Sequence, residues 1–181
     1  VCCMHTLWSM NIIVTGHENG VIRLWNSDAG TWVTSPRALK EPLMCLVEAR
    51  NSRAHLLCGG DYSGRVAVWN LTTFKVNQSE LPVETTLNGP HDKEEPAILC
   101  MAYHAPTDTF FSGGNDKTIR LFRIGTENTA ALQSHKDAVC CVEASNTFLL
   151  SGDDSGEIVL WRIFHAVTRG RDASMANKQL P

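Results

Sequence analysis

The sequence lacks a strong excess of charge of either sign and any long apolar run. Its 16 Lys and Arg residues stand against 19 Asp and Glu, for a net charge of −3, so no basic field is available to attract nucleic-acid phosphates or anionic lipids. No apolar run approaches the ~18 residues that a membrane-spanning helix needs, and the first ten residues, VCCMHTLWSM, lack the charged flank and cleavage site of a signal peptide. We therefore expect a soluble, cytoplasmic protein that binds neither nucleic acid nor membrane.

Motifs for catalysis and metal binding are also missing. None of the seven cysteines forms a CxxC pair, and none of the seven histidines lies at metal-ligand spacing from another His or Cys. No G-x-S-x-G nucleophile elbow is found. Aspartates recur in turns, at Asp61, Asp116, Asp153 and Asp154, where structural hydrogen bonding is the more common use. We expect no catalytic residue, metal, cofactor or small-molecule substrate.

What the 181 residues do contain is a repeat. Four segments share a small residue, a glycine, a polar turn and an alternating run that ends in a large aromatic residue: TGHENGVIRLWN (15–26), GGDYSGRVAVWN (59–70), SGGNDKTIRLFR (112–123) and SGDDSGEIVLWR (151–162). The aromatic residues Trp25, Trp69, Phe122 and Trp161 are 44, 53 and 39 residues apart, close to the roughly 40 to 45 residues of a four-stranded propeller blade. A polar, proline-bearing insert at 81–96 accounts for the longer interval.

Each repeat predicts strands rather than a phosphate-binding loop. A glycine-rich phosphate loop needs a helix after the turn, whereas VIRLW, RVAVW, TIRLF and EIVLW have the period of two that is typical of strands. A second strand precedes each turn and places four cysteines at one equivalent position: Cys3, Cys45, Cys100 and Cys141. Because a thiol in an apolar run acts as a small apolar filler, we expect these cysteines to be buried and reduced.

The chain resembles the WD-repeat β-propellers over nearly all of residues 1–163. The resemblance implies an all-β fold of four-stranded antiparallel blades, at about 1–35, 36–80, 81–130 and 131–165. The tail at 166–181 is expected to be a flexible end or a short partner-binding strand, because it shows no outer strand for the last blade. Propellers usually have about 4 to 8 blades. A closed ring of four is possible, but we favour an incomplete ring, the carboxy-terminal four blades of a larger one that commonly has seven.

The resemblance also implies a hydrogen-bond network in each blade, from a Trp on the third strand through a Ser or Thr on the second to a turn Asp and a preceding His. The fourth repeat offers the fullest set: His135, Ser151, Ser155 in place of the Asp, and Trp161. The third offers Ser112 and Asp116, and also His91, whose alignment is uncertain because of the insert. The first offers Thr15, Asn19 and Trp25. The second offers Ser63 and Trp69, with Gly59 in place of the hydroxyl residue. We expect blade rigidity to depend mainly on packing.

In the family, the residue before the turn Asp often faces partners. Here these residues are Glu18, Tyr62, Asn115 and Asp154, and Asp137 would join them in a mostly acidic rim with one aromatic anchor. Simple solvated turn residues are an equal alternative. We predict a non-catalytic scaffold that holds protein partners in a multi-subunit assembly. A peptide or modified-residue recognition module and the regulatory propeller of a multidomain protein are the alternatives, and family roles extend to cytoskeletal and ciliary complexes.

Overall fold

The computed structural model describes residues 1–34, 36, 39–51, 53–74, 81, 83–88, 94, 96–126, 130–163 and 175–179. These residues form four antiparallel sheets of four strands each, in the chain orders β1-β2-β3-β4, β5-β6-β7-β8, β9-β10-β11-β12 and β13-β14-β15-β16, which we number sheets 1 to 4. Two short 3₁₀ turns, η1 (Trp8–Met10) and η2 (Ala105–Thr107), follow the first strands of sheets 1 and 3. None of the described residues forms a helix long and apolar enough to cross a membrane.

The strand bounds follow the repeats of the sequence. Sheet 1 contains β1 (Cys3–Leu7), β2 (Ile12–Gly16), β3 (Ile22–Asn26) and β4 (Thr31–Thr34). Sheet 2 contains β5 (Leu43–Arg50), β6 (His55–Asp61), β7 (Arg65–Asn70) and β8 (Val83–Asn88). Sheet 3 contains β9 (Ile98–His104), β10 (Thr109–Gly114), β11 (Thr118–Phe122) and β12 (Ala130–Gln133). Sheet 4 contains β13 (Val139–Ala144), β14 (Phe148–Asp153), β15 (Ile158–Ile163) and β16 (Met175–Gln179).

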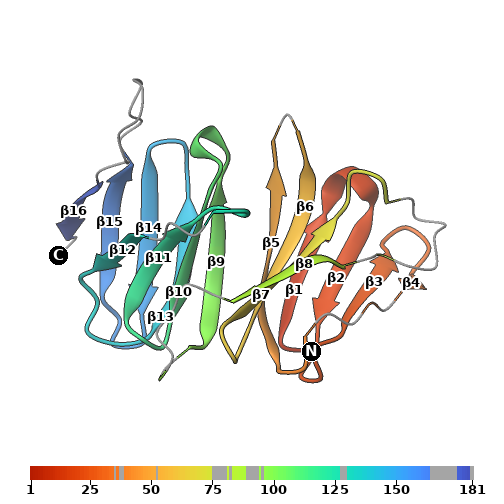
Figure 1. Cartoon of the computed structure of the whole chain (residues 1–181), viewed down its shortest axis with the longest axis horizontal. Helices are drawn as coiled ribbons and strands as arrows, with labels where there is room; N and C mark the ends of the chain where they lie inside the picture. Colours follow the sequence, from red (N-terminus) through yellow and green to blue (C-terminus); the bar gives the residue numbers. More distant parts are fainter. Residues whose placement is uncertain are drawn as a thin grey trace.

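The four sheets stack side by side in an open arc. The first strands of consecutive sheets lie together, β1 beside β5, β5 beside β9, and β9 beside β13. Sheets 1 and 4 lie at opposite ends of the molecule (Figure 1). The all-β fold and the incomplete ring that the sequence predicts are therefore confirmed.

The apolar core is divided into three clusters, one between each pair of neighbouring sheets. The third-strand aromatic residue of each later sheet lies in the cluster that it shares with the preceding sheet: Trp69 with sheet 1, Phe122 with sheet 2 and Trp161 with sheet 3. Trp25 has no preceding sheet in the described structure, and its side chain is only partly buried. Packing between sheets therefore uses the repeated aromatic residue as its centre.

The outer strands of two sheets differ from the expected boundaries. Strand β8 pairs with β7, so the second sheet continues past residue 80 into the stretch that the sequence indicated as an insert. Strand β16 pairs with β15, so part of the expected tail completes the last sheet. An outer strand is held mainly through the backbone ladder, and its sequence, as in VETTLN and MANKQ, needs no strong apolar alternation.

Candidate functional site

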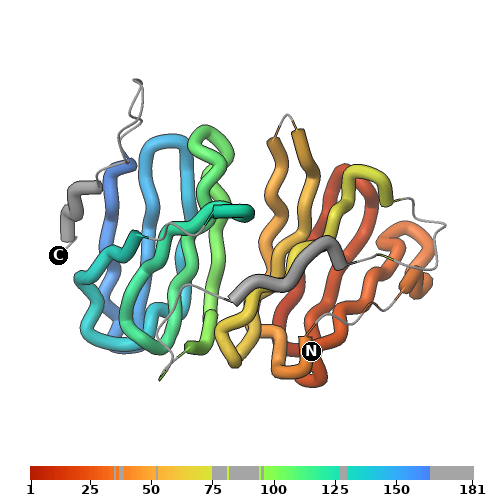
Figure 2. The backbone as a smooth tube through the Cα atoms, viewed as in Figure 1, coloured from red at the N-terminus to blue at the C-terminus, as the bar shows by residue number. Residues whose placement is uncertain are grey.

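The turns between the second and third strands of the four sheets lie along one edge of the arc, the lower edge in Figure 2. We call this edge the turn edge; it comprises residues 17–21, 62–64, 115–117 and 154–157. The strand registers place four predicted partner-binding residues at one equivalent turn position: Glu18, Tyr62, Asn115 and Asp154. The side chains of Glu18 and Asp154 are exposed and that of Asn115 is partly buried, while Tyr62 is 53% exposed.

Backbone hydrogen bonds fix this turn position against the loop that enters each sheet. The amide of Tyr62 donates to the carbonyl of Pro42 at 3.0 Å, and the amide of Asp154 donates to that of Ala138 at 3.0 Å. The amide of Asn115 makes the equivalent bond to the carbonyl of Ala97, at 3.3 Å. Asp137 precedes Ala138 and is exposed, so its carboxylate lies next to the Asp154 turn. The side chains of the turn edge therefore project from a fixed backbone.

A buried aspartate organises two of these turns from within. In sheet 2, Oδ1 of Asp61 accepts hydrogen bonds from the amide and hydroxyl of Ser63, at 3.0 and 2.9 Å, and from the amide of Arg65, at 2.8 Å. In sheet 4, Oδ1 of Asp153 accepts the equivalent bonds from Ser155, at 3.1 and 2.7 Å, and from the amide of Glu157, at 3.0 Å. The acid of the fourth repeat is thus Asp153, and Ser155 is one of its donors rather than its substitute.

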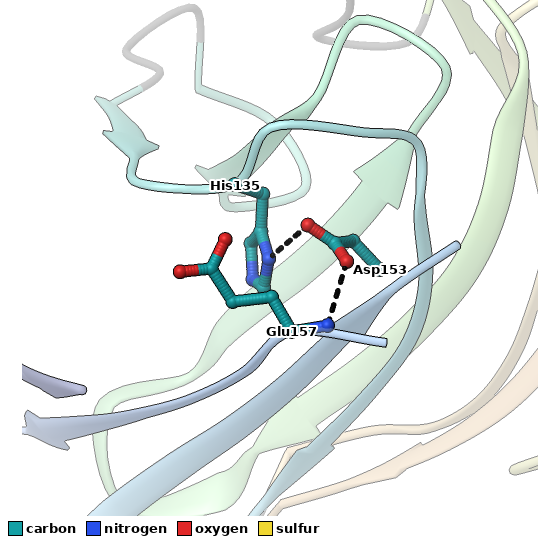
Figure 3. Close-up of side chains that lie close together, drawn as sticks. All are labelled: His135, Asp153 and Glu157. Carbon is teal, nitrogen blue, oxygen red and sulfur yellow. Dashed lines mark hydrogen bonds and ion pairs between the residues drawn. The ribbon is translucent and has the colours of Figure 1, made fainter. Parts of the chain in front are cut away.

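Sheet 4 contains a continuous buried hydrogen-bond chain, of which Figure 3 shows the contact between His135 and Asp153. The indole of Trp161 donates to Oγ of Ser151 at 2.8 Å, and this oxygen lies 2.7 Å from Nε2 of His135. On the other side of the ring, Nδ1 of His135 lies 3.1 Å from Oδ2 of Asp153. A neutral histidine protonated on Nδ1 satisfies every member, since Ser151 then donates to Nε2 and the ring donates to the carboxylate.

The charge of Asp153 is stabilised by its donors. Burial alone would raise the pKa of this carboxyl, but hydrogen bonds from the Ser155 hydroxyl, the Glu157 amide, the His135 ring and the Lys136 amide together hold the pKa well below its usual range. Asp153 is therefore ionised at neutral pH. It links the turn edge, through Ser155, to the core of the sheet, through His135.

The other sheets keep only parts of this network. In sheet 1, the indole of Trp25 donates to Oγ1 of Thr15 at 3.1 Å, and Thr15 lies 3.1 Å from Nε2 of His17, which the sequence did not indicate as a member. Asn19 stays in the turn, where its side-chain oxygen accepts from the amide of Val21 at 3.3 Å. Sheet 1 thus has a short chain that ends at its own turn histidine.

Sheet 2 has replaced the polar chain by apolar contacts. Gly59 offers no hydroxyl. Leu39 stands at the position of His135, because each lies four residues before the first strand of its sheet, and Leu39 is fully buried. As a result the buried Nε1 of Trp69 and Oδ2 of Asp61 make no hydrogen bond. Apolar packing around Trp69 has to offset the free-energy cost of burying these two polar atoms without a hydrogen bond.

In sheet 3, Ser112 is fully buried on the second strand, while Asp116 is bound within the turn. Oδ1 of Asp116 accepts from the hydroxyl of Thr118 at 2.7 Å, and Oδ2 accepts from the guanidinium of Arg120 at 3.1 Å. His91 lies outside the described residues. The third-strand residue is Phe122, which has no indole donor.

One cluster could in principle offer metal ligands. His135, Asp153 and Glu157 each have a ligand atom, and these atoms lie within 4.8 Å of one another (Figure 3). Both ring nitrogens of His135 and both carboxylate oxygens of Asp153 already take part in hydrogen bonds within the protein. The cluster is thus arranged as a structural network, and metal binding would require that network to break.

The cysteines lie in register, as predicted, but differ in burial. Cys45 and Cys100 are buried and Cys3 is partly buried, and burial raises the pKa of Cys3 and Cys100 to about 12 and that of Cys45 well above its usual value. Cys141, expected to be buried, is exposed. All seven cysteines are free thiols. The high pKa values keep the inner thiols protonated, which makes them poor nucleophiles and poor zinc ligands.

Polar contacts between sheets, on the opposite edge from the turn edge, were not predicted from the sequence. Glu48 of β5 lies 2.6 Å from Nε2 of His55 and 3.7 Å from Nε2 of His5, so its carboxylate joins sheets 1 and 2. His104 lies 3.2 Å from the carbonyl of Asn146 and so joins sheets 3 and 4. The contacts between Glu48 and His5 and between His104 and Asn146 each span two repeats, so they leave no local sequence pattern.

Comparison with known proteins identifies the repeat. The family model described as "WD domain, G-beta repeat" matches residues 83–123 and 126–162. The chain is 29% identical over 121 residues to DDB1- and CUL4-associated factor 5 of Homo sapiens, covering 65% of this chain and 12% of that protein. It is 25% identical over 154 residues to apoptotic protease-activating factor 1 of Rattus norvegicus, covering 83% of this chain and 11% of the relative. The chain thus spans only a small part of the curated relatives that it matches.

Solved structures show the same architecture. The RRP9 WD40 repeats superpose with a TM-score of 0.71 at 18% identity, covering 88% of this chain and 47% of that chain. The computationally designed Ika4 protein superposes with a TM-score of 0.64 at 24% identity, covering 84% and 85% of the two chains. WD40 propellers are generally non-catalytic and serve protein interaction. The two matched repeats, the four-sheet fold and these neighbours show that this chain contains WD repeats and has the fold of a WD-repeat β-propeller.

Proposed function

We propose that this chain is a non-catalytic scaffold that binds protein partners through its turn edge and holds them in a multi-subunit assembly. The observation that carries the proposal is Tyr62, a side chain 53% exposed on a turn whose backbone is bound to Pro42 and to the buried Asp61. An exposed tyrosine on a rigid support loses little conformational entropy when it binds.

The charges around Tyr62 indicate the chemistry of the partner. Glu18, Asp137 and Asp154 are all exposed and acidic, Lys117 is an exposed base of the turn edge, and the chain as a whole has a net charge of −3. Such a rim favours a basic partner surface and accelerates encounter more than it adds affinity. We infer that the partner presents Lys or Arg residues around a pocket that takes the Tyr62 ring.

A relative supports the assembly role. The name of DDB1- and CUL4-associated factor 5 describes that protein as associated with two others, and it shares 29% identity with this chain over 121 residues. The shared region covers 12% of that protein, so the proposal carries over membership of an assembly and not the identity of the partners.

The test is affinity purification of the tagged chain from cell extract with quantification of the bound proteins. Tyr62→Ala should lower the recovery of specific partners about tenfold or more, because tyrosine hot spots contribute about 2 kcal/mol or more. Arg53→Ala, an exposed change on the opposite edge, is the matched control and should retain them. Equal recovery with Tyr62→Ala and wild type would reject the turn edge as the binding surface, and tight binding of a short peptide alone would favour a recognition module.

A further inference from the structure

The contact between sheets 1 and 2 contains polar side chains at a position where the other sheets meet through apolar ones. His5 of β1 and Glu48 of β5 face each other there. By strand register, the equivalent pairs at the next two contacts lie in the apolar core or against it: Val47 with Tyr103, and Ala102 with Ala144. The contact between sheets 1 and 2 thus differs from the repeated pattern at one place.

His55 of β6 joins these two residues, and we call the three side chains the His-Glu-His cluster. Nε2 of His55 lies 2.6 Å from Oε1 of Glu48, a hydrogen-bond distance. Nε2 of His5 lies 3.7 Å from Oε2 of the same carboxylate, which is beyond hydrogen-bond range. This nitrogen of His5 is buried and makes no hydrogen bond with the described residues. One carboxylate therefore has an imidazole nitrogen near each of its oxygens, and one of these nitrogens has no hydrogen-bond partner.

Two histidines and one glutamate form a ligand set that suits zinc. Zinc binds imidazole nitrogens at about 2.0–2.1 Å and carboxylate oxygens at about 2.0–2.2 Å in a tetrahedral arrangement, and a water molecule takes the fourth position when the protein supplies three ligands. Two ligand atoms on one such ion therefore lie roughly 3.4 Å apart. Nε2 of His5 and Oε2 of Glu48, at 3.7 Å, are close to this separation.

We propose that His5, Glu48 and His55 bind a zinc ion that joins sheet 1 to sheet 2. The ion lies between Nε2 of His5 and Oε2 of Glu48, and the His55 ring turns its Nε2 from Oε1 toward the ion to supply the third ligand. Each neutral ring then carries its proton on Nδ1. Binding replaces one hydrogen bond by three metal–ligand bonds. The spacing of histidines in the sequence does not indicate this site, because its ligands come from two repeats.

The surroundings of the His-Glu-His cluster allow an ion to enter. The three side chains are between 14% and 29% exposed, so the cluster lies near the surface rather than deep in the core. Arg50 is the cross-strand neighbour of His55. It is exposed, so solvent and salt screen its positive charge. This site lies on the opposite edge from the turn edge, and zinc binding there is separate from partner binding at Tyr62.

Compactness alone would favour the other set of possible ligands, His135, Asp153 and Glu157, whose ligand atoms lie within 4.8 Å of one another. There, however, both ring nitrogens of His135 are engaged, one with Asp153 and one with Ser151. Zinc would have to displace the buried hydrogen-bond chain of sheet 4. In the His-Glu-His cluster it displaces a single hydrogen bond and supplies the buried nitrogen of His5 with a partner, which favours the contact between sheets 1 and 2.

Isothermal titration calorimetry with zinc chloride tests the site. The chain carries Cys2→Ser, Cys140→Ser and Cys141→Ser, because these three thiols are exposed and would bind zinc themselves. One zinc ion should bind to each chain. A chain that binds no zinc at micromolar concentrations would overturn the proposal.

Substitution of the ligands in the same background locates the ion. His5→Gln and Glu48→Gln should each raise the zinc dissociation constant at least about a hundredfold, because each removes one of three protein ligands and the loss of an outer-shell partner alone costs about 10- to 100-fold. Glu157→Gln is the matched control: it removes a carboxylate from the other set of ligands and should leave the constant unchanged. Affinity lost in Glu157→Gln but kept in His5→Gln would place the ion in sheet 4 and overturn the proposal.

Hydrogen exchange tests the same site without any change to its ligands, so its outcome stands even where a glutamine variant fails to fold. Zinc should slow amide exchange in β1, β5 and β6 relative to the same chain in EDTA, because it links sheets 1 and 2. Strands β13 and β14 of sheet 4 should exchange at the same rate in both conditions. Protection of β13 and β14 alone, or of no strand, would contradict a zinc link between sheets 1 and 2.

Discussion

One turn position takes a left-handed backbone conformation in all four sheets. It is held by Gly20, Gly64 and Gly156, with φ of 72°, 77° and 85°, and by Lys117, with φ of 61°. In this conformation a residue with a Cβ destabilises the fold by roughly 1–2 kcal/mol. Glycine avoids this strain, but it loses more backbone entropy on folding, which offsets part of the gain. We therefore expect Lys117→Gly to raise the free energy of unfolding by about 1 kcal/mol, measured by urea denaturation.

Gly156→Lys is the matched control for this change. No atom lies within 4 Å of a Cβ built at Gly156, so the substitution tests backbone conformation without a steric clash. It should destabilise the chain by about the amount that Lys117→Gly stabilises it. Stabilities that change in the same direction would show that contacts of the lysine side chain, and not φ, determine the effect.

Asp153 should make the stability of the chain depend on acid. Its pKa is lower in the folded chain than in the unfolded one, so as pH falls the unfolded chain takes up the proton first. The stabilisation is complete above the ordinary Asp pKa of about 4 and is lost as pH falls toward the folded pKa. Asp153→Asn should lower stability at neutral pH and flatten the fall below about pH 4. Thermal unfolding across pH measures this, and Asp154→Asn, an exposed change in the same turn, is the control. If the stability of Asp153→Asn fell as steeply below about pH 4 as that of the wild type, the loss would come from other carboxyl groups.

The sequence did not indicate Asp153 as the acid of the hydrogen-bond network in sheet 4, because the choice lies among neighbouring residues of one turn. In SGDDSG the family resemblance placed Ser155 at the position where an Asp is usual, although two aspartates precede it. The fold selects Asp153, because it pairs with Val139 at the start of β13, close to His135. Contacts such as Glu48 with His5 could not be predicted, since they join different repeats and depend on how the sheets stack.

At the scale of the element, the third strands offer a direct measure of what the hydrogen-bond network contributes. Trp69 and Trp161 occupy equivalent buried positions, but only the indole of Trp161 has an acceptor, Ser151 at 2.8 Å. Trp→Phe removes similar apolar area at both sites. We expect Trp161→Phe to cost about 1 kcal/mol more than Trp69→Phe, the net contribution of one hydrogen bond. Urea denaturation of the two variants measures the difference, and equal costs would show that packing alone holds the aromatic residue.

The sequence predicted some strands well and others poorly. Third strands such as IRLWN and RVAVW combine a preceding glycine turn with alternating apolar residues and a terminal aromatic, so three signals agree. Outer strands such as VETTLN have only one neighbour in their own sheet and carry no such combination. A strand that is specified by its backbone ladder rather than by a buried face leaves little periodic signal to read.

At the scale of the whole molecule, stability should vary along the arc. Among the described residues, sheets 2 and 3 have a sheet on each side, whereas sheets 1 and 4 have a neighbour on one side only (Figure 1). In stacked repeats the total stability is approximately a sum of terms for each repeat and each interface. The end sheets each lack one interface term, so they should open more readily than the middle sheets.

Amide hydrogen exchange can separate this effect from differences within the sheets. Strands β2, β6, β10 and β14 are all second strands with a partner on each side, so they differ mainly in what covers their faces. In dilute solution we expect β6 and β10 to exchange more slowly than β2 and β14. Uniform exchange in all four strands would mean that the sheets open as one unit and that stacking does not set their local stability.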